Sequence, residues 1–93
     1  MRGREELTLV AREHFLSAEQ VECERLVVVK AVRGNLQPGT GSGEKAGFRF
    51  FCRPEPEFRR DSVFVWRGMR LDVARMDVWS GHVEFALVIG RGP

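Results

Sequence analysis

The chain has 93 residues, the size of one domain rather than two, and 43% of them are hydrophobic. Its 15 basic and 13 acidic side chains are interleaved and give a net charge of +2, which argues against strong sequence-independent DNA binding. No apolar run approaches the roughly 20 residues that span a bilayer, and the first ten residues contain no signal-peptide core. We therefore expect an intracellular protein without membrane contact.

The residues that usually carry chemistry are few and scattered. Cys23 and Cys52 lie far apart without CxxC spacing, so we expect free, buried or half-buried thiols in a reducing compartment. Adding His14 and His82 gives no familiar zinc-ligand spacing. His82 lies two residues from Glu84, but no nucleophile or second carboxylate joins them. We expect no catalytic residues, no metal and no cofactor, and hence no enzyme.

The first half of the chain reads as strands. Residues 1–5 are expected to be frayed, and Leu7–Arg12 alternates apolar and polar side chains as a half-buried strand does. Residues 13–24 allow two interpretations. One is a short helix over residues 17–24 that Ser17 and Gln20 cap. The favoured one is a hairpin whose next strand begins at Val21. Leu26–Val29 is an almost continuous apolar run, which indicates a strand that is buried on both faces or central in its sheet.

A glycine-rich segment divides the chain. Gln37–Gly47 contains four glycines, one proline and only one apolar side chain, an alanine, so we expect a long flexible loop. Gly47–Arg53 reads as the next strand, and the prolines of Pro54–Glu57 end it.

The clearest pattern lies in Asp61–Ile89. A two-residue turn at Arg67-Gly68 would pair Trp66 with Met69 and Phe64 with Leu71 on one face. A three-residue loop would mix the faces, so alternation selects the first register. A four-residue loop in the same register also remains open, because arginine is not ideal in a type I′ turn. Ser80-Gly81 marks a second turn before an alternating last strand.

Six or seven short antiparallel strands with turns between them predict an all-β domain, a small barrel or sandwich covering residues 1–93, with residues 90–93 as a frayed tail. We expect its core to contain nine residues on the apolar strand faces: Leu9, Val28, Phe50, Phe64, Trp66, Leu71, Val73, Phe85 and Leu87.

Read together, several segments resemble the head-closure proteins of long-tailed bacteriophages, which are also called head-tail adaptors or stoppers. After a short N-terminal strand and a hairpin, these are VRGNLQP (Val32–Pro38), FRFFCRP (Phe48–Pro54), DSVFVWRGMRLDV (Asp61–Val73) and VEFALV (Val83–Val88). The resemblance covers roughly residues 5–90.

The resemblance implies an assembly protein of the virion neck that is made in the bacterial host cytoplasm. Such small barrels form a ring, commonly of twelve copies, between a portal or adaptor protein and a tail terminator or tail protein. Double-stranded DNA passes through the ring without sequence-specific binding. In some members a long loop closes the channel, and the residues that match it here are Gln37, Pro38, Gly39, Thr40, Gly41, Ser42, Gly43, Glu44 and Lys45.

Five further residues could contact neighbouring subunits or partner proteins: Arg59, Arg60, Arg67, Arg70 and Trp79. A solvated surface explains the arginines as well. Two other functions remain open. The chain could be a monomeric barrel that binds peptide or nucleic acid across Phe48–Arg53, or a tail-terminator subunit in a ring of six.

Overall fold

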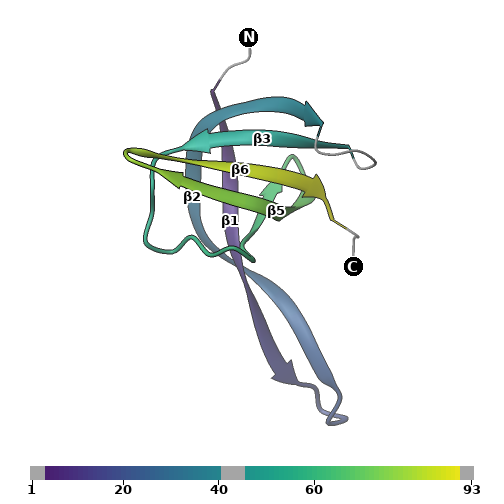
Figure 1. The fold of residues 1–93 in the computed structure, drawn as a ribbon. Coiled ribbons are helices and arrows are strands. Elements are labelled where there is room, and N and C mark those ends of the chain that lie inside the picture. The colour runs from purple at the N-terminus through teal and green to yellow at the C-terminus, as the bar shows by residue number, and fades with distance from the viewer. Residues whose placement is uncertain (1–3, 41–45, 91–93) are drawn as a thin grey trace.

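The computed structural model describes residues 4–40 and 46–90, which form an all-β fold with no helix in the described part. The strands are β1 (Arg4–Leu16), β2 (Glu22–Thr40), β3 (Ala46–Cys52), β4 (Val63–Trp66), β5 (Met69–Trp79) and β6 (His82–Ile89). All pairings are antiparallel, and the order β1-β2-β3-β6-β5-β4 closes into a barrel (Figure 1). The expected all-β barrel is confirmed.

The β4–β5 hairpin has the register that alternation predicts. Trp66 pairs with Met69 and Phe64 with Leu71. Both turn residues have left-handed backbone, with φ of 52° at Arg67 and 77° at Gly68. Positive φ at both central residues defines a type I′ turn, so arginine does occupy its first position. The need to keep one face apolar outweighs the conformational cost at Arg67.

A β-bulge adjusts strand β5 to the barrel. Val73 pairs with Leu87 and Arg75 with Ala86, so Ala74 is the extra residue. The extra residue changes which positions point inward. Leu71 and Val73 face the core before the bulge and Met76 packs against it afterwards.

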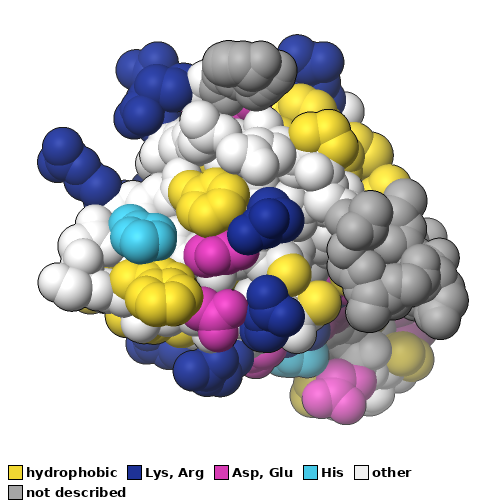
Figure 2. All heavy atoms as spheres, turned by 45° about the horizontal axis from the view of Figure 1, so that its top comes forward, with side chains coloured by type: hydrophobic (Ala, Val, Ile, Leu, Met, Phe, Trp, Pro, Cys, Tyr) yellow, Lys and Arg dark blue, Asp and Glu magenta, His cyan; other side chains and the backbone are white. Residues whose placement is uncertain are grey.

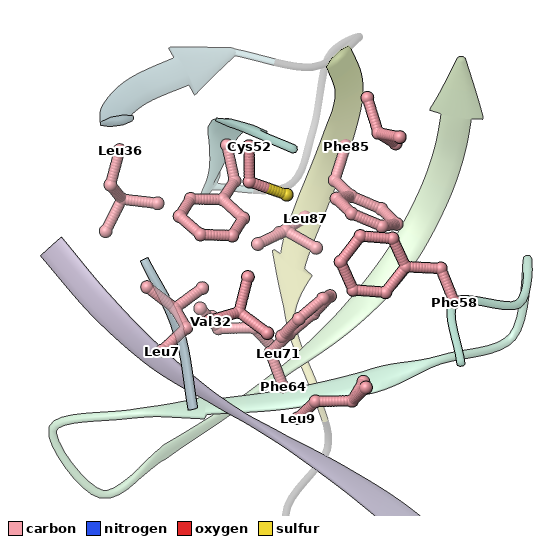
Figure 3. Packing of buried hydrophobic residues seen from close by; sticks show 12 residues of the cluster. Leu7, Leu9, Val32, Leu36, Cys52, Phe58, Phe64, Leu71, Phe85 and Leu87 are labelled. Carbon is pink, nitrogen blue, oxygen red and sulfur yellow. The ribbon is translucent and has the colours of Figure 1, made fainter. Parts of the chain in front are cut away.

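Aromatic rings fill the barrel interior. Phe64 and Phe85 are completely buried with ring centroids 5.1 Å apart, and Phe58 packs edge-to-face on Phe85 at 5.0 Å (Figure 3). Phe58 comes from the β3–β4 connection, where Ser62 Oγ accepts a hydrogen bond from the Arg59 backbone N–H at 2.8 Å. The short turn thus directs a ring into one end of the barrel, where edge-to-face pairs add to burial.

Most of the expected core is confirmed. Six of the nine residues are buried: Leu9, Phe50, Phe64, Leu71, Phe85 and Leu87. Trp66 and Val73 are partly buried against the cluster. The prediction that Val28 belongs to the core is wrong, because its side chain is 70% exposed. The apolar run Leu26–Val29 lies on a part of β2 that has left the barrel, so the prediction that it is buried on both faces or central in its sheet is also wrong.

Three expected boundaries need correction. Residues 17–20 form a turn and β2 begins at Glu22, so the hairpin interpretation is right and the short helix over residues 17–24 is wrong. Residues 37–40 and 46–47 pair as strands, with Gln37 opposite Arg49 and Gly39 opposite Gly47, so the proposed loop at 37–47 is too long. Arg4 and Glu5 belong to β1 and are not frayed. The tails 1–3 and 91–93 lie outside the described residues.

Replacing Phe64 with alanine tests the core. Phe64→Ala should lower the free energy of unfolding by about 3–5 kcal/mol, because it leaves a cavity between other rings. Val28→Ala is the control, and it should change that free energy by less than about 0.5 kcal/mol. Denaturant unfolding at a concentration where the chain is monomeric measures both. A comparable loss in the two variants would contradict the assignment of Phe64 to the core and Val28 to the surface.

Candidate functional site

The most prominent feature outside the barrel is the distal part of the β1–β2 hairpin. β1 and β2 pair from Arg4↔Asn35 to Leu16↔Glu22. However, β4 pairs with β1 only at residues 8–10, and β3 pairs with β2 only at residues 34–40. Residues 11–29, which we call the arm, therefore form a two-stranded ribbon without a third strand, and Figure 1 shows it projecting away from the barrel. The molecule measures 48 Å along its longest axis and 21 Å along its shortest.

The arm exposes an unusual number of apolar side chains. Seven of the ten large hydrophobic residues that are exposed in the described chain lie on it, each between 39% and 70% accessible: Phe15, Leu16, Val21, Leu26, Val27, Val28 and Val29. A two-stranded hairpin is marginally stable alone in water, and contiguous apolar exposure marks interaction surfaces. The described part of the subunit thus leaves these seven apolar side chains partly or largely uncovered.

Local contacts hold the arm in shape without a partner. Arg25 Nε donates to Glu13 Oε1 across the ladder at 2.7 Å, and its guanidinium lies 5.0 Å from the centroid of the Phe15 ring. In the turn, Ser17 Oγ accepts hydrogen bonds from the backbone N–H groups of Glu19 and Val21. These contacts pre-form the arm, which lowers the ordering entropy that docking would otherwise cost.

The end of the arm is acidic. Residues 13–25 contain four glutamates and one arginine, a net charge of −3, against +2 for the whole chain. Glu13 is paired with Arg25, and Glu24 Oε2 lies 3.7 Å from His14 Nε2. Glu19 and Glu22 have no ion pair with any other described residue. The tip therefore carries carboxylates whose charge the described part of its own subunit leaves unpaired.

A second feature is a hollow of about 500 Å³ where β2 and β3 diverge. Its wall includes the arginines Arg4, Arg33 and Arg53, together with Phe51 and His82. None of these three arginines forms an ion pair or side-chain hydrogen bond with another described residue. The eight other described arginines each form at least one such contact. We call this region the arginine hollow.

Two glutamates near the hollow reduce its positive charge only in part. Glu55 lies in its wall but accepts a hydrogen bond from Lys30 Nζ at 2.8 Å. That hydrogen bond and the charges of Glu55 and Glu57 raise the pKa of Lys30, so Lys30 stays a cation at neutral pH. Glu6 lies opposite Arg33 in the β1–β2 ladder without forming an ion pair with it. The hollow therefore remains a positive depression.

The residues predicted as contacts do not form one site. Arg59 and Arg60 lie between β3 and β4, and both donate to backbone carbonyl oxygens. Arg67 lies over the Trp66 ring in the β4–β5 turn, and Arg70 forms an ion pair with Asp72 on β5. No hydrogen bond or ion pair within the described chain joins any two of the five predicted contact residues, so their role in contacts stays a prediction.

Trp79 lies at the β5–β6 turn, is 55% exposed and stacks on His82 with ring centroids 5.9 Å apart. Glu84 forms an ion pair with Arg49 rather than with His82. Nothing in this arrangement joins His82 and Glu84 into an acid–base pair.

Of the predicted channel-closing segment, residues 37–40 belong to the β2–β3 ladder. Residues 41–45 lie outside the described residues, so their role in closing a channel stays a prediction.

Sequence reasoning missed both the arm and the arginine hollow. The available signal for the arm was the combination of an apolar run with an excess of glutamate in residues 13–25. No signal could have identified the hollow, because Arg4, Arg33 and Arg53 come from three strands or strand ends that only the barrel brings together.

Comparisons with family models, with curated proteins and with solved structures find no match for this chain. Within residues 4–40 and 46–90, no cluster of three or more His, Cys, Asp or Glu side chains has a geometry suited to a metal ion. In the same residues, no helical segment has the length and apolar character of a membrane crossing.

Cys52 provides a chemical test of burial beside the hollow. Burial, assisted by the charge of Glu55, raises the pKa of its thiol to about 12. At pH 8 only about one thiol in 10,000 would be ionised, so Cys52 should not react with a thiol reagent in the folded protein. The half-buried Cys23 should react, giving one titratable thiol before unfolding and two after it. Two thiols that react at equal rates in the folded protein would contradict this.

Gly34 provides a structural test of the hollow. It pairs with Cys52 where β3 leaves β2, and a Cβ there would collide with the Phe51 carbonyl oxygen and lie 2.9 Å from Cys52 Cβ. Gly34→Ala should therefore destabilise the protein, by about 1–3 kcal/mol for overpacking at a buried site. Gly68→Ala is the contrasting variant, because no atom lies within 4 Å of its added Cβ and only its φ of 77° opposes the change. Thermal unfolding should show the larger loss for Gly34→Ala.

Proposed function

We propose that this protein is a structural component of the neck of a long-tailed bacteriophage. Copies of the chain form a ring below the portal that extends and closes the DNA channel and offers the tail an attachment surface. The role is one of assembly, without catalysis or a cofactor. The protein acts in the virion after assembly in the host cytoplasm.

The observation that carries the proposal is the arm. A pre-formed ribbon that exposes seven large apolar side chains is costly for a monomer in water, because apolar area left in water forgoes roughly 25 cal/mol of burial free energy per Å². A protein that works in many copies covers such a surface with its neighbour. The closed six-stranded barrel also agrees with the small barrel that the sequence resemblance implies.

The surface charge is compatible with a DNA channel. In the middle of the face in Figure 2, Lys and Arg side chains lie next to Asp and Glu side chains, with hydrophobic side chains beside them. Arg49 is neutralised by Glu84, and Arg75 by Asp77. A mixed surface of this kind holds phosphates weakly, which is what sliding DNA requires.

A second function, the single-barrel binding module, is favoured by one observation. The arginine hollow adjoins Phe51 and His82, and Trp79 stacks on His82. Arginines beside exposed aromatic rings suit single-stranded nucleic acid. Of strand Phe48–Arg53, however, Phe50 is completely buried and Phe48 packs against the core, so the strand offers fewer rings than its sequence indicates.

The neck function is tested in particles that assemble without this chain. Capsids made in its absence should package DNA and then lose it, and they should not join tails, whereas protein supplied in trans should restore both steps. Encapsidated DNA is measured after nuclease treatment, and tail joining by electron microscopy. Normal DNA retention and tail joining in its absence would refute the function. A ring of six rather than twelve, measured by native mass spectrometry, would support the tail-terminator alternative.

A further inference from the structure

The arm needs a cover that its own subunit does not provide. Its outer strand edges are unpaired at residues 11–16 of β1 and from Glu22 to Arg33 of β2. Standard interfaces bury about 20–30 residues on each side, and the arm has nearly that many. The arm alone can therefore supply one side of a specific interface.

The unpaired charges indicate what covers the arm. Among the described carboxylates, those without an ion pair are Glu19 and Glu22 at the arm tip and Glu6 on the barrel, and Glu24 has only His14 as a partner. The unpaired described arginines are Arg4, Arg33 and Arg53, all in one hollow. Residues 13–25 carry −3 and the rest of the chain therefore +5. Charge complementarity thus exists between two surfaces of the same chain.

The two surfaces cannot meet within one molecule. Glu22 and Arg33 lie on one continuous strand, β2, and eleven residues of strand span roughly 36 Å. Figure 1 shows the arm directed away from the barrel that carries the hollow. The arm tip that enters the hollow must therefore come from another molecule.

We propose that the acidic tip of the arm docks in the arginine hollow of a second copy of this chain. Glu19, Glu22 and Glu24 of one subunit face Arg4, Arg33 and Arg53 of the next. The apolar side chains of the arm pack along the strand edges that border the hollow, next to Ala31 and Phe51. The contact joins two different surfaces, so two copies can satisfy it by exchanging arms, and more copies can satisfy it head to tail in a ring or a filament. This inference deepens the proposed function, because it names the contact through which the ring forms.

The test uses charge reversal in the full chain. Glu19→Arg with Glu22→Arg reverses the tip, and Arg33→Glu with Arg53→Glu reverses the hollow. Each double variant should weaken self-association at least about tenfold in sedimentation velocity at low salt, because like charges then face each other. The two variants mixed in equal amounts should associate again, since each reversed surface then meets a complementary one. Association of the wild type should also weaken as salt rises.

A control variant separates a local effect from a change in net charge. Arg49→Glu with Arg75→Glu changes the net charge as much as the hollow variant does, on exposed residues outside the hollow and outside the predicted contact set. This variant should associate like the wild type, and circular dichroism should show that every variant is folded. Equal loss of association in the control, or no recovery in the mixture, would overturn the proposed contact.

Two further outcomes distinguish the contact from the function. Rings that form equally well from both reversed variants would refute the arm–hollow contact and leave the neck function standing. Suppose that association is salt-sensitive and the mixture restores it, but that capsids made without this chain still retain DNA. These results would establish the contact and refute the neck function. A wild-type chain that stays monomeric at every concentration and binds a single-stranded oligonucleotide through Arg33 and Arg53 would overturn the contact in favour of the binding module.

Discussion

Barrel closure depends on three residue pairs between β1 and β4, Thr8↔Val65, Leu9↔Phe64 and Val10↔Val63. Only a few backbone hydrogen bonds join β1 to β4 at this seam. Leu9 and Phe64 are buried in the core there, so apolar packing also holds the two strands together. Directly after the seam, the β1–β2 ladder changes register, with Leu9 opposite Lys30 and Val10 opposite Val28. The extra residue on β2 increases local twist and bend, as bulges do, and here it coincides with the change from barrel to arm.

This arrangement gives β1 and β2 two functions each. Residues 4–10 of β1 and 30–40 of β2 line a closed core in which no strand edge is left open at the seam. Residues 11–16 of β1 and 22–29 of β2 form a ribbon with two open edges. Natural proteins usually protect such edges with charge, and the arm does so partly with the Glu13–Arg25 pair. The apolar residues at Leu26–Val29 remain exposed between barrel and tip. A surface that combines protected and unprotected positions fits a contact made with one specific neighbour rather than with any apolar partner.

The sequence predicts those elements whose pattern depends on local contacts. The β4–β5 register follows from alternation alone, because a slip of one residue would bury Arg70 and Asp72. The six confirmed core residues lie on alternating strand faces for the same reason. Val28 shows the limit: a β-branched run indicates burial, but a strand that extends past its sheet leaves such side chains exposed. The arginine hollow depends on strand order, which the amino-acid pattern does not encode locally.

The geometry of the proposed contact also limits the assembly it can build. A two-fold dimer can satisfy the proposed contact only by exchanging arms, with each tip in the hollow of the other subunit. A two-fold axis through the tip or through the hollow would instead bring acidic tip against acidic tip or arginine against arginine. Such pairings are repulsive, since the tip residues 13–25 carry −3 and the three arginines of the hollow lack partners in the described chain. A heterologous contact avoids this, because every subunit then uses one tip and one hollow. Repeated with a rotation that closes after a whole number of copies, it forms a ring in which no tip or hollow is left unused and each weak contact is reinforced by all the others; any other rotation gives a filament.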